Sequence, residues 1–67
     1  MNHIEFNVPK GFPFDESLPS ETYLRREFPH WNRFVRRAGT ATLQCVLNDS
    51  GIHGMLRVLA YFELTNR

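Results

Sequence analysis

The chain has 67 residues, of which 42% are hydrophobic, and its formal net charge is only +1. A chain this short buries about 60% of the surface of its unfolded form, so we expect one small domain over residues 1–67. Nine aromatic residues exclude a disordered chain, and the near-neutral charge argues against a protein that coats DNA.

The first predicted element is a short strand near the start of the chain. Residues 3–8 alternate polar and apolar side chains, which is the period of a half-buried strand, so we place a strand at Ile4–Val8. Prolines then interrupt any regular pattern up to residue 19, which predicts an irregular connection. We expect Phe12 and Phe14 to hold this connection against the core.

Residues 20–38 are predicted to be helical. Ser20 is suited to the N-cap, and Glu21 follows in the first turn, where the helix dipole favours negative charge. Gly39 is expected to end the segment in the left-handed conformation. Pro29 removes an amide donor and restrains the residue before it, which predicts a kink or two short helices meeting there.

This segment has two faces at about 100° per residue. The predicted core face consists of Leu24, Phe28, Trp31, Val35 and Ala38, with Tyr23 and Phe34 at its edge. The opposite side carries five arginines, namely Arg25, Arg26, Arg33, Arg36 and Arg37. The last three stay clustered even if the helix breaks at the proline.

The remaining residues, 40–67, fit two structures. Ala41–Asn48 and Ile52–Leu64 both match the period of a strand, and turn-forming residues separate them, which predicts a β-hairpin. The rival is two helices, with an apolar stripe on the second made by Leu56, Leu59, Ala60 and Phe62. Gly51 and Gly54 in the first turn of that helix would cost about 1 kcal/mol each relative to alanine, which favours the hairpin.

The predicted fold class is therefore α+β, with a small antiparallel sheet of about three strands covered by one kinked helical segment. The alternative is an all-α small helical domain. In the α+β fold the core would contain Phe6, Phe28, Trp31, Val35, Leu43, Leu47, Leu56 and Phe62.

The arginines are the strongest candidate site. Seven of the eight basic residues are arginine, which suits bidentate pairing with carboxylates or phosphates. We predict partner binding by Arg25, Arg26, Arg33, Arg36 and Arg37, with Trp31 as a candidate anchor. The competing interpretations are a solvated helix face, partly compensated by nearby glutamates, and core packing for the tryptophan.

The sequence offers no catalytic, metal or cofactor motif. Cys45 is the only cysteine, and CxxC, HExxH and the glycine-rich phosphate-binding patterns are missing. We expect Cys45 to be a small buried residue and the histidines to lie on the surface or cap helices. A helix-turn-helix motif would need residues 55–64 as its recognition helix, and that segment is too apolar to read bases. The chain is predicted not to be an enzyme.

Three features predict the location of the protein. No apolar run reaches the about 20 residues that span a bilayer, and residues 1–5 do not resemble the start of a signal peptide. A lone cysteine is typical of a reducing compartment. We expect a soluble protein of the cytoplasm, with no membrane partner.

These observations predict a non-catalytic interaction protein: an inhibitor, adaptor or accessory subunit, of the kind that phages and mobile elements also carry. Its arginine face would bind an acidic surface of a larger protein or nucleoprotein complex. One alternative is a nucleic-acid-binding module that uses the same face. Another is a fragment, or a protomer of an obligate oligomer, because the apolar segment 55–64 has almost no polar tail after it.

Overall fold

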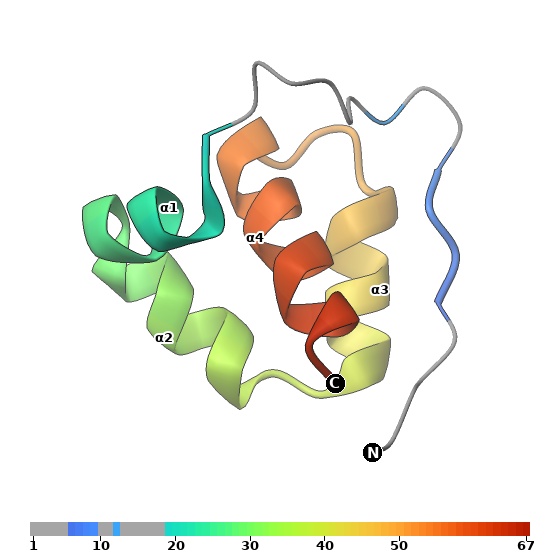
Figure 1. The fold of residues 1–67 in the computed structure, drawn as a ribbon. Helices are drawn as coiled ribbons and strands as arrows, with labels where there is room; N and C mark the ends of the chain where they lie inside the picture. Colours follow the sequence, from blue (N-terminus) through green and yellow to red (C-terminus); the bar gives the residue numbers. More distant parts are fainter. Residues whose placement is uncertain (1–5, 10–11, 13–18) are drawn as a thin grey trace.

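The computed structural model describes residues 6–9, 12 and 19–67, and these contain four helices and no strand (Figure 1). The helices are α1 (Glu21–Glu27), α2 (Pro29–Arg37), α3 (Thr40–Asn48) and α4 (Gly54–Thr65). The α+β prediction is therefore wrong for the described part of the chain, and the all-α alternative is the correct fold class.

The segment predicted as the first hairpin strand, Ala41–Asn48, lies within α3. Its buried residues are Leu43, Val46 and Leu47, which have the i, i+3, i+4 spacing of a helix face. A largely apolar run also matches a period of two, so alternation alone did not separate the two structures. The helical spacing within the run was the better signal.

The second predicted strand, Ile52–Leu64, is replaced by α4, and the two glycines explain the error. Gly51 lies in the turn before α4, where its amide donates to Oδ1 of Asp49 at 2.8 Å. Gly54 is the first residue of α4. Glycine is costly in a helix interior because fixing its backbone loses more conformational entropy, and neither glycine is in the interior, since Gly51 precedes α4 and Gly54 is at its N-terminal end.

The prediction of an N-terminal strand at Ile4–Val8 is also wrong for residues 6–8, the part of this range that the structure describes. Residues 4 and 5 lie outside the described residues, as does Phe14, and residues 6–8 form no strand. The backbone of Asn7 instead pairs with a side chain. Its amide donates to Oε1 of Gln44 at 2.9 Å, and its carbonyl accepts from Nε2 of Gln44 at 2.6 Å. The side chain of Phe12 is buried, as expected.

The helical prediction for residues 20–38 is confirmed in most of its detail. The amide of Tyr23 donates to Oγ of Ser20 at 3.1 Å, which makes Ser20 the N-cap of α1. Two short helices meet at Phe28, with Pro29 in the first turn of α2. The prediction for Gly39 is wrong, because its φ is −71° and it serves as the N-cap of α3.

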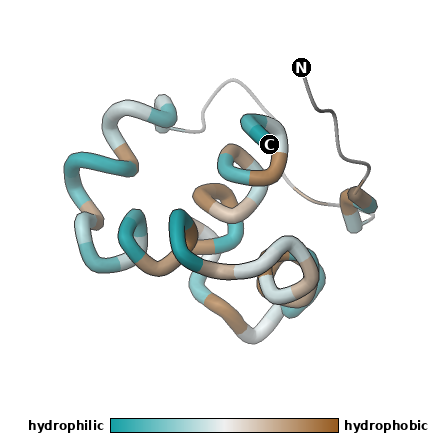
Figure 2. The backbone as a smooth tube through the Cα atoms, turned by 90° about the horizontal axis from the view of Figure 1, so that it is seen from below, coloured by the Kyte–Doolittle hydropathy of each residue, from teal (hydrophilic) through white to brown (hydrophobic). Residues whose placement is uncertain are grey.

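Helix α4 is the centre of the fold and contacts the other three helices (Figure 1). Figure 2 shows hydrophobic segments interrupted by hydrophilic ones along α4, which ends near C, whereas most of α1 and α2 is hydrophilic. The buried core consists of Phe12, Leu24, Val35, Leu43, Val46, Leu47, Val58, Leu59, Ala60 and Leu64. The other predicted core residues are partly buried against it, namely Phe6, Phe28, Trp31, Leu56 and Phe62. No described helix has both the length and the apolar character needed to cross a membrane.

The start of α4 is held by His53. Its Nδ1 accepts from the amide of Met55 at 3.1 Å, and its ring lies 5.1 Å from that of Trp31. We expect His53→Ala to lower the free energy of unfolding by about 1 kcal/mol, because loss of a side-chain N-cap typically costs that much. Urea denaturation followed by circular dichroism measures the change. The exposed His30 is the matched control, and an equal effect of His30→Ala would contradict this role for His53.

Candidate functional site

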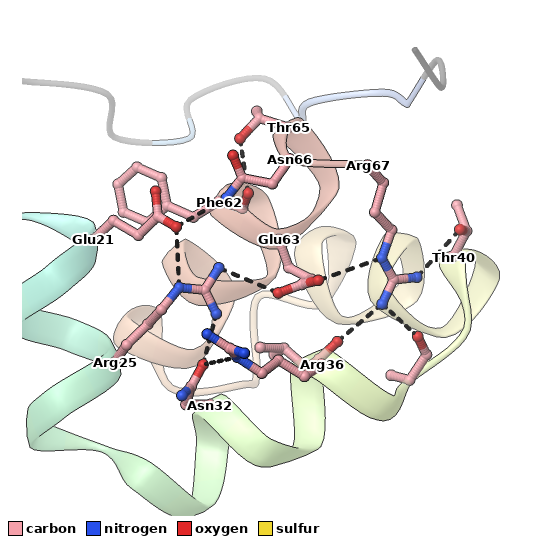
Figure 3. Close-up of polar contacts among 12 residues, drawn as sticks. Glu21, Arg25, Asn32, Arg36, Thr40, Phe62, Glu63, Thr65, Asn66 and Arg67 are labelled. Atoms are coloured by element: carbon pink, nitrogen blue, oxygen red, sulfur yellow. Dashed lines mark hydrogen bonds and ion pairs between the residues drawn. The ribbon is translucent and has the colours of Figure 1, made fainter. Parts of the chain in front are cut away.

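Arg25 lies in an internal network of polar contacts (Figure 3). Its guanidinium contacts Oε2 of Glu21 at 3.0 Å, Oδ1 of Asn32 at 2.6 Å and Oε1 of Glu63 at 3.2 Å. Its side chain is only 14% exposed. Two carboxylates from α1 and α4 therefore neutralise this arginine within the molecule. Although the sequence placed Arg25 among the partner-binding arginines, the structure gives it a role in joining helices.

Arg67 completes this network at the other side of Glu63. Its Nε lies 3.5 Å from Oε2 of Glu63. Its Nη2 donates to the carbonyl oxygens of Val35 at 3.0 Å and Ala38 at 2.7 Å (Figure 3). These carbonyls lie at the C-terminal end of α2, where backbone acceptors have no intrahelical donor. Arg67 thus caps the C-terminal end of α2, and its positive charge interacts favourably with the negative end of the helix dipole.

Arg57 has a similar role at the end of α3. Its Nε and Nη2 both donate to the carbonyl oxygen of Leu47, at 3.0 and 2.8 Å. The guanidinium also lies 5.2 Å from the ring centroid of Phe12, within the range of a cation–π contact. Arg57 and Arg67 were not predicted as structural residues, because their carbonyl acceptors come close only in the folded chain.

The described arginines that contact neither a carboxylate nor a backbone carbonyl oxygen all lie on α2. Arg33, Arg36 and Arg37 are exposed, and within residues 6–9, 12 and 19–67 none of them pairs with a carboxylate. Arg36 donates to the neutral Oδ1 of Asn32 at 3.2 Å. Helix α2 itself has no acidic residue. The structure therefore keeps together the three arginines that the sequence predicted would stay clustered.

The two other predicted site residues have partners within the molecule. Arg26 is exposed on α1, with its Nε 3.6 Å from Oε2 of Glu27 and its guanidinium 5.9 Å from the ring of Tyr23. Trp31 is partly buried, and its ring stacks on that of Phe28 at 4.7 Å. Because Trp31 also contacts the ring of His53, its contacts are those of a residue packed against the core.

A hollow of about 430 Å³ lies beside the exposed arginines of α2. It is lined by His30, Arg33, Phe34, Arg37 and Ala38. Phe34 is 42% exposed, although the sequence placed it only at the edge of the core face. Its neighbours gave no clear signal, because the residues one turn away include the polar His30 and Arg37 as well as the apolar Trp31 and Ala38.

The described residues contain no cluster of histidine, cysteine and carboxylate side chains that could hold a metal ion. Cys45 is exposed on α3, so the prediction that it is buried is wrong. His30 is exposed and His53 caps α4, as expected for surface and capping histidines, and His3 lies outside the described residues.

No protein-family model, curated protein or solved structure matches this chain.

Proposed function

We propose that this chain is a non-catalytic interaction protein whose α2 helix binds an acidic surface of a larger protein. The exposed surface formed by Arg33, Arg36 and Arg37 is called the α2 arginine cluster. The observation that carries the proposal is a division among the described arginines. Arg25, Arg26, Arg57 and Arg67 each contact a carboxylate or a backbone carbonyl oxygen. Among residues 6–9, 12 and 19–67, the α2 arginine cluster has neither kind of partner, and Arg36 contacts only the side-chain oxygen of Asn32.

The energetics of α2 support a role for the cluster outside the fold. Arg33 is three and four residues from Arg36 and Arg37, and like charges at these spacings destabilise a helix by about 0.2–0.5 kcal/mol per pair. Arg36 and Arg37 lie in the last turn, where the helix dipole favours them, but Arg33 lies near the middle of α2. Carboxylates of a partner would relieve this repulsion and form charge-assisted hydrogen bonds.

A protein partner is favoured over nucleic acid by the charge of the whole chain. The net charge is +1, and the exposed arginines without a carboxylate partner in the described part of the chain lie on α2, a helix of nine residues. Proteins that bind along a phosphate backbone use many cationic contacts, because each neutralised phosphate adds to affinity. An acidic patch of a protein needs only a few arginines, and arginine is enriched among the residues that dominate protein interfaces.

Charge reversal tests the proposal. The triple variant Arg33→Glu, Arg36→Glu, Arg37→Glu should keep its helical circular dichroism spectrum, because all three side chains are exposed. Affinity purification from the native host should recover a partner with the native chain and not with the variant. Binding of the purified partner should then weaken on the order of 30-fold, since each exposed pair contributes about 0.2–1 kcal/mol.

The single variant Arg26→Glu is the matched control, because it reverses an exposed arginine outside α2. It should weaken binding less than Arg33→Glu does. Unchanged affinity of the triple variant would contradict the proposal. A complex with DNA or RNA that dissociates steeply with added salt, in the absence of a protein partner, would contradict it as well.

A further inference from the structure

The hollow around Phe34 has the composition of a recognition pocket. Its residues lie three or four positions apart along one side of α2 and its C-cap, so Phe34 and Ala38 provide an apolar surface beside Arg33 and Arg37. Arginine side chains can lie along apolar surface with their aliphatic stems while the guanidinium groups reach into solvent. The hollow thus combines apolar contact area with positive charge beside it.

We propose that this hollow, which we call the Phe34 pocket, receives one apolar side chain of the partner, with acidic residues on either side of it. The inference rests on the proposed function, and it adds the chemical class of the recognised segment. Phe34 is 42% exposed, so it has apolar area left that a partner can remove from water. Its position next to the α2 arginine cluster means that the same partner segment can reach both.

The charges around the pocket select the occupant. None of its lining residues is acidic, and Arg33 and Arg37 both lie on it without a carboxylate partner in the described part of the chain. A basic or neutral apolar segment would leave these guanidinium groups uncompensated as water is excluded. An acidic segment with one apolar residue satisfies both parts of the surface. Aromatic and arginine side chains side by side are also typical of interface hot spots.

Tyr23 provides a comparison within the same molecule. It is exposed to a similar fraction, 43%, but it lies on α1 and contacts the guanidinium of Arg26, which itself pairs with Glu27. Tyr23 does not line the Phe34 pocket. Tyr23, an exposed aromatic residue away from the α2 arginine cluster, therefore serves as a control for non-specific hydrophobic binding.

Titration with designed peptides tests the inference by NMR. One probe is a short synthetic peptide of aspartate and glutamate around a central leucine, and the second probe has serine in place of the leucine. Both should shift the amide signals of α2 at low salt, and the leucine peptide should bind about tenfold more tightly. Phe34→Ser should remove this preference while the serine peptide binds as before. Tyr23→Ser should retain it, and circular dichroism should confirm that both variants are folded.

The outcomes separate this inference from the proposed function. Equal affinity of the two peptides for the native chain would overturn the Phe34 pocket, and the proposed function would stand if Arg33→Glu still weakened both complexes. Failure of both peptides to bind would contradict the proposed function itself. Tighter binding of a single-stranded oligonucleotide than of either peptide would overturn both, because bases can stack on an exposed ring beside arginines.

Discussion

Replacing Glu63 by glutamine should lower the free energy of unfolding by about 2–3 kcal/mol. The carboxylate of Glu63 contacts Arg25 at 3.2 Å and Arg67 at 3.5 Å, and its side chain is only 16% exposed. Glutamine has nearly the same shape but no charge, and its amide group would face a guanidinium. Breaking a fully buried ion pair costs about 3–5 kcal/mol, and the partial exposure of this pair reduces that cost.

The loss is large relative to the stability of a domain of this size, which is typically about 3–5 kcal/mol. The network connects α1 and α4 through Arg25, and it connects α4 with the end of α2 through Arg67. Three helices therefore lose contacts when one carboxylate is neutralised. This loss would leave about 0–3 kcal/mol, so we expect Glu63→Gln to unfold at a clearly lower urea concentration than the native chain.

Urea denaturation followed by circular dichroism measures this effect. Glu27→Gln is the matched control, because Glu27 pairs with Arg26 at 3.6 Å and both side chains are well exposed, 48% and 69%. Exposed pairs contribute at most about 1 kcal/mol and are screened by salt, so this control should change stability little. Similar losses in the two variants would mean that the Glu63 network does not stabilise the fold.

The same network shows why the arginine site could be predicted only in part. A straight helical projection placed five arginines on one face, but α1 and α2 are separate helices that meet at Phe28. Arg25 contacts a carboxylate of α4, far along the chain, and no local pattern reveals such a partner. Arg33, Arg36 and Arg37 lie within α2, so local spacing was sufficient to group them.

The buried core could also be predicted only in part from the sequence. In α1 and α2 the polar and apolar residues lie on different sides, so Leu24 and Val35 could be predicted as buried from helical spacing. Helix α4 contacts three other helices and has few polar residues to mark an outer face. Its apolar residues fit several periods, and Gly51 and Gly54, placed in a first turn, were each assigned the full cost of glycine in a helix, although Gly51 precedes α4 and Gly54 is its first residue. Residues 40–67 were therefore assigned to strands.

The exposure of Phe34 could not be predicted either, and the reason is different. A residue at the edge of an apolar arc is buried only if a neighbouring helix extends over it. That depends on how the other helices pack against α2. The sequence placed Phe34 and Tyr23 at this edge, and both are exposed in the folded chain.

Truncating Leu59 to alanine should lower the free energy of unfolding by about 3 kcal/mol. Leu59 is 0% exposed in α4, and leucine-to-alanine changes in a core cost about 2–5 kcal/mol through lost contacts and the cavity that remains. Leu56, on the same helix, is only partly buried, so Leu56→Ala should cost less. Thermal unfolding followed by circular dichroism compares the two, with trimethylamine N-oxide added if a variant is unfolded in buffer.

This pair of variants also tests the fold. If residues 52–64 formed a strand in place of α4, Leu56→Ala would cost more stability than Leu59→Ala. Alternate residues of a strand point to opposite faces, so a strand that buries Leu56 together with Val58 and Ala60 would expose Leu59. Exposed truncations rarely cost more than about 0.5 kcal/mol. Both changes remove the same carbon atoms, so differences in side-chain chemistry cancel. A larger loss for Leu59→Ala supports α4, whereas a larger loss for Leu56→Ala would restore the hairpin.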